Sequence, residues 1–257
     1  MKLLFWRKPR IPVLVLHGIL ARRAELNIGS YGPLIDRACA AASGGHLVLD
    51  IESPGGSPVQ SDLIARRIRQ GAARHNVKVH AVIGEVGASG GYWLACAADR
   101  ILANPMSIVG SIGVVSGGFG FEAALAKLGV TRRLRIAGAN KARNDPFSPE
   151  RPQDAEFTQA LLDELHERFK AWVRERRGAK LKDEEAALFD GGYMLGARAQ
   201  ELGLVDGLGD VAGVVRELGG EKAQAQSFAP RRRGLLARLP RMLAEAQAEL
   251  QTPRLRL

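Results

Sequence analysis

Short apolar runs alternate with segments of helical periodicity along most of the chain. Three runs rich in β-branched residues predict buried strands at Ile11–Leu20, His46–Glu52 and Val77–Ile83. Between and beyond them, apolar positions recur three and four residues apart, which predicts amphipathic helices. Strands that alternate with helices are typical of an α/β fold with a mostly parallel sheet and flanking helices.

The same pattern predicts the remaining elements. Helices are expected at Tyr31–Ala42, from after Ser57 to about Arg74, near Phe119–Leu128, over about Gln153–Arg177, and on both sides of Leu204–Asp206. Short strands are expected at Arg100–Ala103, Ile112–Val115 and Arg132–Ile136. Gly138–Pro149 is rich in Asn, Asp and Pro, which predicts a loop.

The stretch Val77–Trp93 (VKVHAVIGEVGASGGYW) carries the clearest local signal. Its apolar run is followed by glycines around Ser89 and then by a segment with the character of a buried helix. A strand, a glycine turn and a helix present one hydroxyl on a sharp bend and leave backbone N–H groups free at the helix N-terminus. Three interpretations fit this stretch: a nucleophile elbow, a phosphate-binding loop, and a tight turn without chemistry.

Length and charge divide the chain into a core and two tails. The 257 residues, 46% of them hydrophobic, suit one large domain with appendages. The net charge of +10 is concentrated in residues 1–10 and in residues 229–257, where seven arginines face two glutamates. The core, residues 11–228, is nearly neutral and has no basic face with interleaved aromatic residues. A nucleic-acid partner is therefore not expected.

The two tails and the two cysteines indicate the cellular compartment in which the protein is expected. Both tails mix basic residues with bulky apolar ones, a pairing that favours contact with a membrane surface, although solvated tails fit equally well. Neither tail approaches the ~20 apolar residues of a spanning helix. Cys39 and Cys96 have no CxxC spacing and are expected to be buried thiols in a reducing compartment. We therefore expect no metal, no cofactor, and a cytoplasmic protein with peripheral membrane contact as an option.

A serine nucleophile needs a base, and the chain offers few candidates. GASGG around Ser89 fits the G-x-S-x-G elbow of α/β-hydrolases, but these enzymes place a histidine after the serine. Here only His166 follows, inside a charged helical segment. Lysine is the alternative, since arginine does not release its proton near neutral pH. Among the lysines after Ser89, Lys141 alone lies in a glycine-bounded loop rather than in a helix or a charged run.

Several linked motifs resemble one known family. In chain order they are SPGG from Ser53, GASGGYW around Ser89, ADRILANPMSIVGSIGV, AGANKARNDPF and GLVDGLG. The series resembles SppA-type signal peptide peptidases, Ser-Lys proteases of the ClpP/crotonase superfamily, over about residues 11–215. The resemblance implies a ClpP/crotonase-like fold, with Ser89 as nucleophile and Lys141 as general base. It also implies an oxyanion hole from the backbone N–H groups of Gly56 and Gly90.

Further expectations follow from this resemblance. The segment of Ile112, Gly113 and Val114 would pair with an extended substrate peptide by strand addition. The implied function is a serine endopeptidase that hydrolyses short or unfolded peptides, cleaved signal peptides among them, through an acyl-enzyme. Single-copy relatives imply a homo-oligomeric ring, such as an octamer. Two alternatives remain: a crotonase-like acyl-CoA enzyme, and a catalytically silent scaffold at the membrane. The sequence leaves open the natural substrate, and whether Lys141 serves its own subunit or a neighbour.

Overall fold

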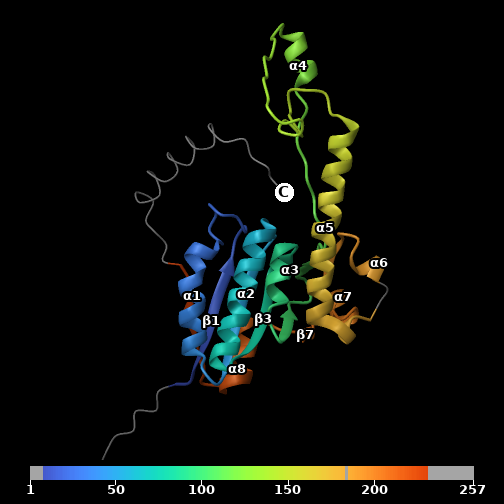
Figure 1. The fold of residues 1–257 in the computed structure, drawn as a ribbon. Helices are drawn as coiled ribbons and strands as arrows, with labels where there is room; N and C mark the ends of the chain where they lie inside the picture. The colour runs from blue at the N-terminus through green and yellow to red at the C-terminus, as the bar shows by residue number, and fades with distance from the viewer. Residues whose placement is uncertain (1–7, 183–184, 231–257) are drawn as a thin grey trace, which may run out of the picture. The chain divides into compact units, whose positions relative to one another are not determined.

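The computed structural model describes residues 8–182 and 185–230 (Figure 1). The chain forms two compact units. The first contains the described residues up to Gly113 and from Phe169 onward, and the second is Val114–Arg168. The expected tails, residues 1–10 and 229–257, lie almost entirely outside the described residues, so their behaviour stays a prediction.

The first unit is built on a sheet of eight strands among its described residues. The strands are β1 (Arg10–His17), β2 (His46–Ser53), β3 (Lys78–Ala88), β4 (Arg100–Ala103), β5 (Ile108–Gly110), β6 (Tyr193–Leu195), β7 (Gly207–Leu208) and β8 (Gln224–Phe228). Their order is β6-β5-β3-β2-β1-β8, with β4 paired to β3 and β7 paired to β4. All pairs are parallel except β5 with β6. The predicted α/β fold with a mostly parallel sheet is confirmed.

The helices, too, follow the predicted periodicity. They are α1 (Ile28–Ala41), α2 (Pro58–His75), α3 (Gly90–Ala95), α4 (Glu122–Lys127), α5 (Pro152–Arg177), α6 (Glu185–Leu188), α7 (Gly196–Glu201) and α8 (Val211–Gly219), with a 3₁₀ turn at Gly178–Lys180. Asn27 caps the start of α1 and Ser57 that of α2, each accepting a hydrogen bond from a backbone N–H three residues on. The predicted helices at Tyr31–Ala42, after Ser57 and at Gln153–Arg177 are confirmed to within a few residues.

Helices cover both faces of the sheet. On one face, α1, α2, α3 and the end of α5 pack on strand residues such as Leu49 and Ile83 in the larger apolar core. On the other face, Val214 and Val215 of α8 pack on Val48 and neighbouring strand residues. Successive residues of a strand point to opposite faces, so a strand buried on both faces reads as a nearly continuous apolar run. This explains why β1, β2 and β3 are the strands that the sequence shows most clearly.

The second unit contains α4 and the first part of α5, and the rest of it is irregular. α4 buries none of its residues. The strand predicted at Arg132–Ile136 is wrong: those residues, all described, form no regular secondary structure. An alternation of apolar and polar residues predicts a strand only where a partner strand supplies hydrogen bonds, and residues 114–168 contain none. The loop predicted at Gly138–Pro149 is confirmed. α4 is shorter than the helix that was expected near Phe119–Leu128.

The strand predicted at Ile112–Val115 is also wrong, because the strand lies earlier, at β5. Gly110 and Ser111 both adopt positive φ, of 108° and 52°, which ends the extended run. The Ser111 N–H then donates to the Gly192 carbonyl at 2.6 Å. Ile112 is buried immediately after this bend.

A helix that crosses a membrane must be both long and apolar. In the described parts of the chain, no helix meets both conditions.

Candidate functional site

Ser89 stands at a sharp turn between β3 and α3. Its backbone angles are φ 51° and ψ −121°, a region that residues with a Cβ rarely occupy. The turn is fixed on both sides, because the Ser89 N–H donates to the Gly110 carbonyl at 2.8 Å and the Ser89 carbonyl accepts from the Trp93 N–H at 2.9 Å. The strand-turn-helix geometry expected for residues 77–93 is therefore present. An otherwise unfavourable conformation held by neighbouring hydrogen bonds is a common feature of functional sites.

The turn after β2 lies directly against this elbow. A Cβ added to Gly55 would come 2.7 Å from the Gly90 nitrogen and 3.0 Å from the Ser89 Oγ. A Cβ added to Gly90 would come 2.5 Å from the Ser61 Oγ, and one added to Gly91 would overlap the Ser53 carbonyl. The glycines of SPGG and GASGG thus allow two backbone segments to meet at the serine.

The backbone around Gly56 is oriented by a parallel bridge to Leu20. The Leu20 N–H donates to the Gly55 carbonyl at 2.9 Å, and the Ser57 N–H donates to the Leu20 carbonyl at 2.6 Å. In an extended chain the intervening residue presents its own N–H to the opposite side. The Gly56 N–H therefore faces away from Leu20, while Gly90 provides the first N–H group of α3. These are the two amides that the resemblance to SppA-type peptidases implies for an oxyanion hole.

A bulge in β3 precedes the elbow, and Glu52 holds it. The register between β2 and β3 shifts after Ile51, so that Ser53 lies opposite Gly87. The Glu52 carboxylate accepts the N–H groups of Glu85 at 2.8 Å and Val86 at 3.0 Å, which the bulge removes from the ladder. The sequence analysis missed this role. An acidic residue at the end of a strand is the only signal that the sequence offers for it.

Lys141 belongs to the second unit, and its side chain is exposed there. Its N–H closes a turn onto the Gly138 carbonyl at 3.1 Å. Ser89, Gly56 and Gly90 all belong to the first unit, and they are the predicted site residues that the structure brings together. Among the residues expected to bind a substrate strand, Ile112 is buried, and the Gly113 N–H turns back to the Ser111 carbonyl at 3.0 Å. Val114 begins the second unit.

Cys39, Cys96 and His17 are further candidate nucleophiles and bases of the first unit. Burial raises the pKa of the Cys39 thiol to about 11 and that of Cys96 to about 12, so neither provides a thiolate near neutral pH. His17 lies 3.1 Å from Asp50, and this hydrogen bond raises the pKa of the imidazole. Both residues lie on the face of the sheet that α8 partly covers, by strand alternation with Val13 and Val48. No cluster of three metal-ligating side chains occurs within residues 8–182 and 185–230.

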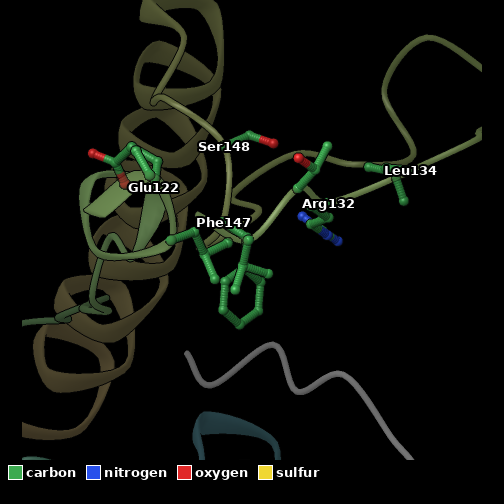
Figure 2. A pocket seen from close by; sticks show the side chains of 9 residues that line it. Glu122, Arg132, Leu134, Phe147 and Ser148 are labelled. Carbon is green, nitrogen blue, oxygen red and sulfur yellow. The ribbon is translucent and has the colours of Figure 1, made fainter. Parts of the chain in front are cut away.

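The second unit has a cavity of its own, of about 340 Å³ (Figure 2). Leu134, Phe147 and other apolar side chains line it together with Glu122, Arg132 and Ser148. Arg132 forms an ion pair with Asp145, and its guanidinium carbon lies 5.2 Å from the centre of the Phe147 ring. Ser148 donates to the same Asp145 at 2.7 Å. Arg132 and Ser148, which line this cavity, are therefore both bound to Asp145.

Comparison with known proteins identifies the family. A family model described as Peptidase family S49 matches residues 72–225. The chain belongs to peptidase family S49. The matched residues of the S49 model include Ser89 and Lys141, whereas the SPGG turn lies before them. The predicted resemblance to SppA-type peptidases and the ClpP/crotonase-like fold are thereby confirmed.

Three proteins illustrate the range of sequences to which the chain is similar. The chain is 46% identical over 233 residues to a Brucella melitensis protein named Na(+)/H(+) antiporter NhaA, a match over 89% of this chain and 31% of that protein. It is 29% identical over 163 residues to a putative signal peptide peptidase SppA of Enterococcus faecium, over 63% of this chain and 47% of the relative. It is 32% identical over 170 residues to the chloroplastic serine protease SPPA of Arabidopsis thaliana, over 64% and 24%. The chain thus spans less than half the length of each.

Proposed function

We propose that this chain is a serine endopeptidase in which Ser89 is the nucleophile and Lys141 is the general base. The observation that carries the proposal is the strained turn at Ser89. This turn lies at the start of α3 and is packed against Gly55. A side chain held in this conformation exposes its hydroxyl beside backbone N–H groups, which acyl transfer requires. Membership of family S49 supports the same reaction class.

In the first half of the reaction, the neutral Lys141 amine takes the proton from the Ser89 hydroxyl. The Oγ atom then attacks the carbonyl carbon of the scissile peptide bond. The negative charge that develops on the carbonyl oxygen is stabilised by the N–H groups of Gly56 and Gly90. As the C–N bond breaks, the lysine ammonium gives its proton to the departing amine, and an acyl-enzyme remains on Ser89.

In the second half, a water molecule replaces the leaving peptide. Lys141 takes a proton from this water, and the resulting hydroxide attacks the ester carbonyl. The ester C–O bond breaks, the proton returns to the Ser89 Oγ, and the carboxylic acid product leaves. The lysine is neutral again, so the cycle consumes one water and no cofactor.

The proposed substrates are short or unfolded peptides, cleaved signal peptides among them. The Enterococcus relative is named as a signal peptide peptidase, which supports this class. We further propose that the peptide binds as an extended strand beside Ile112, Gly113 and Val114. This segment follows the Gly110 carbonyl, which is already hydrogen-bonded to the Ser89 N–H. Pairing with a peptide would require this segment to extend and to release the Gly113 N–H from the Ser111 carbonyl, so that the peptide runs past the serine hydroxyl.

The proposed assembly is a homo-oligomer, a ring such as an octamer. The second unit supports it, because nine of its large apolar side chains are exposed and α4 buries none of its residues. These exposed side chains are Val115, Phe119, Phe121, Leu128, Val130, Leu134, Ile136, Phe147 and Phe157. Apolar surface of this extent is usually covered by a partner. A second copy is the partner that we propose, with its Ser89 served by Lys141 of the first.

A membrane setting is a further part of the proposal. The Brucella relative is named as an antiporter, and this chain matches 31% of it. The tails of this chain contain both basic and apolar residues, a combination that suits contact with anionic lipid. Co-sedimentation with vesicles containing phosphatidylserine, compared with neutral vesicles and with a chain lacking residues 231–257, tests this contact separately from activity.

Labelling with a fluorophosphonate and hydrolysis of a peptide library test the reaction itself. We expect the wild-type protein to be labelled and active, and Ser89→Ala to be neither. Lys141→Arg keeps the positive charge but cannot act as a base, so it is expected to be inactive as well. Turnover of an acyl-CoA thioester without serine labelling would instead support a crotonase-like enzyme. Unchanged cellular function of Ser89→Ala would support a catalytically silent scaffold.

A further inference from the structure

α5 is one continuous helix of 26 residues that belongs to both units. Its residues up to Arg168 are part of the second unit, and those from Phe169 onward are part of the first. At 1.5 Å per residue such a helix is roughly 39 Å long. Each of its halves makes side-chain contacts to a segment that carries a proposed catalytic residue.

In the second unit, the first turns of α5 hold the loop that contains Lys141. The Asn144 side-chain amide donates to the Thr158 hydroxyl at 3.0 Å, and Thr158 donates to the Asp154 carbonyl at 2.8 Å. Arg143 lies 3.3 Å from the Asp154 carboxylate, and its guanidinium carbon lies 4.0 Å from the centre of the Phe157 ring. The loop is thus attached to α5 through two consecutive residues.

These contacts lie close to Lys141 along the chain. Arg143 and Asn144 are the second and third residues after Lys141, so its Cα is within about 7 Å of the Arg143 Cα. Asp154 is buried and also accepts two hydrogen bonds from Arg151, at 2.7 and 2.9 Å. A buried carboxylate held by two guanidinium groups is a rigid attachment point. The loop therefore has little freedom to move away from the helix beside Lys141.

In the first unit, the last turns of α5 hold the helix that begins at the elbow. The Trp172 indole N–H donates to the Trp93 carbonyl at 3.0 Å, and the two indoles stack with centres 6.0 Å apart. Arg176 donates to the Cys96 carbonyl at 2.8 Å and to the Ala98 carbonyl at 3.1 Å. These carbonyls lie at and beyond the C-terminal end of α3, where a cation is favourable. Trp93 is itself hydrogen-bonded to Ser89 through its N–H.

We propose that α5 positions both catalytic groups of this peptidase: its first half orients Lys141 through Thr158 and Asn144, and its second half orients Ser89 through Trp172 and Arg176. The inference rests on the proposed Ser89 and Lys141 roles. Thr158 and Trp172 are positioning residues, since each acts through a segment that it holds. Displacement of a reacting group by about 1 Å can reduce a rate by about a hundredfold, so loosened contacts reduce turnover.

The two halves of α5 are expected to give different kinetic signatures. Thr158→Val removes the hydroxyl at nearly constant shape, whereas Thr158→Ser keeps it. We expect Thr158→Val to lower kcat about tenfold with KM nearly unchanged. The midpoint of its pH–rate profile should also move, because the surroundings of the base change. Thr158→Ser should restore both. Trp172→Phe should lower kcat by a similar factor at every pH without moving the midpoint.

A matched control lies on the same helix. Gln159 is exposed and donates to Asp163 one turn further along the helix, so Gln159→Ala should retain the wild-type kcat and pH profile. A wild-type profile in Thr158→Val, or an equal loss in Gln159→Ala, would overturn the inference. If Thr158→Val is poorly folded, Asn144→Gly removes the same hydrogen bond from the loop and tolerates the positive φ of 56°.

The outcome also separates this inference from the proposed function. Activity retained in Lys141→Ala would refute the role of the lysine, and with it the inference. An inactive Lys141→Ala together with wild-type kinetics in Thr158→Val and Asn144→Gly would refute the positioning role alone.

Discussion

Gly55 and Ser89 are in contact so close that no side chain fits between them. A Cβ on Gly55 would lie 2.8 Å from the Ser89 Cβ and 3.0 Å from its Oγ, and Gly55 has a φ of 102°. The segment that carries the proposed oxyanion amide is therefore positioned by contact with the nucleophile. Gly55 and Ser89 are 34 positions apart in the chain (89 − 55 = 34), and two neighbouring parallel strands bring them to the same edge of the sheet.

Gly55→Ala tests this contact. We expect it to reduce peptide hydrolysis at least a hundredfold, because the added Cβ displaces Gly90 or Ser89. It should also lower the free energy of unfolding by about 2 kcal/mol. Gly44→Ala is the control, since Gly44 has a similar positive φ of 71° but no atom within 4 Å of an added Cβ. Urea unfolding and hydrolysis rates measure both variants. Equal activity in the two would show that the contact is unimportant.

Ser89→Gly tests the strain at the elbow. The φ of 51° and ψ of −121° are unfavourable for a residue with a Cβ and readily adopted by glycine. We expect Ser89→Gly to abolish hydrolysis and to raise the free energy of unfolding by about 1 kcal/mol. Ser89→Ala keeps the Cβ and should be inactive without this gain. If the two variants are equally stable, the turn stores no strain.

The sequence predicted the sheet best where strands are buried on both faces. β1, β2 and β3 each contain an uninterrupted apolar run (PVLVL, LVL and AVI), and their starts agree with the prediction to within a few residues. The end of β3 was not, because the strand continues past Gly84 and Gly87 to Ala88, supported by the Glu52 carboxylate on Glu85 and Val86. Glu52 and Glu85 are 33 residues apart in the chain, so the contact between this side chain and the bulge leaves no local pattern in the sequence.

Short edge strands were missed for a related reason. β8 has the mainly polar sequence QAQSF and forms only because β1 provides a partner, from Arg10 opposite Gln224 to Leu14 opposite Phe228. Conversely, Arg132–Ile136 alternates like a strand but has no partner. At the candidate site, the elbow and its glycines could be predicted from local spacing. The attachment of α3 and the Lys141 loop to α5 could not, since it depends on tertiary contacts.

Asp206 links the end of α5 to β4, and it should make the free energy of unfolding depend on pH in the acid range. Burial raises its pKa, but hydrogen bonds from Arg177 and Lys180 outweigh this and lower the pKa to about 2. Because the folded value lies below the ordinary 3.8, the unfolded chain binds the proton first as the pH falls. The stabilisation is thus present above about pH 4 and lost towards pH 2.

Asp206→Asn should lower the free energy of unfolding by about 3 kcal/mol at pH 7, since it leaves the buried Arg177 without its ion pair. The variant should lose less stability than the wild type between pH 4 and pH 2. Urea unfolding at several pH values measures this. Parallel curves for the two proteins would show that Asp206 is not the group responsible.

His80 should produce a second pH dependence, near neutrality. Burial lowers its pKa, helped by the charges of His46 and Arg100, while Glu217 and Asp99 act in the opposite direction. Its Nε2 lies 3.0 Å from the His46 Nδ1, and its Nδ1 is buried without a partner among the described residues. The unfolded chain therefore takes up the proton first, and stability falls as the pH drops below about 6.5.

His80→Phe removes this titrating group at similar shape. We expect the free energy of unfolding of the variant to change less than that of the wild type between pH 7 and pH 5. Urea unfolding at pH 7, 6 and 5 compares them. Identical slopes would assign the pH dependence to another group.

The proposed oligomer predicts complementation between inactive subunits. If Lys141 of one copy serves Ser89 of its neighbour, Ser89→Ala and Lys141→Ala homo-oligomers are both inactive, yet a mixture contains interfaces with both groups intact. Random mixing of equal amounts gives about a quarter of such interfaces, and about a quarter of wild-type activity is the expected recovery. Co-refolding of the two variants, followed by peptide hydrolysis, measures this.

The decisive control is a double variant, Ser89→Ala with Lys141→Ala, mixed with wild-type subunits. When the two groups act across an interface, each double-variant subunit inactivates the shared sites at both of its interfaces, including those with wild-type neighbours. Activity then falls below the wild-type fraction of the mixture. When both groups act within one subunit, activity equals that fraction, and the two single variants show no recovery. Native mass spectrometry establishes that the oligomers are mixed, so an absence of recovery then places Ser89 and Lys141 in the same subunit. Dilution below the assembly constant provides an independent check, since shared sites lose specific activity as subunits dissociate.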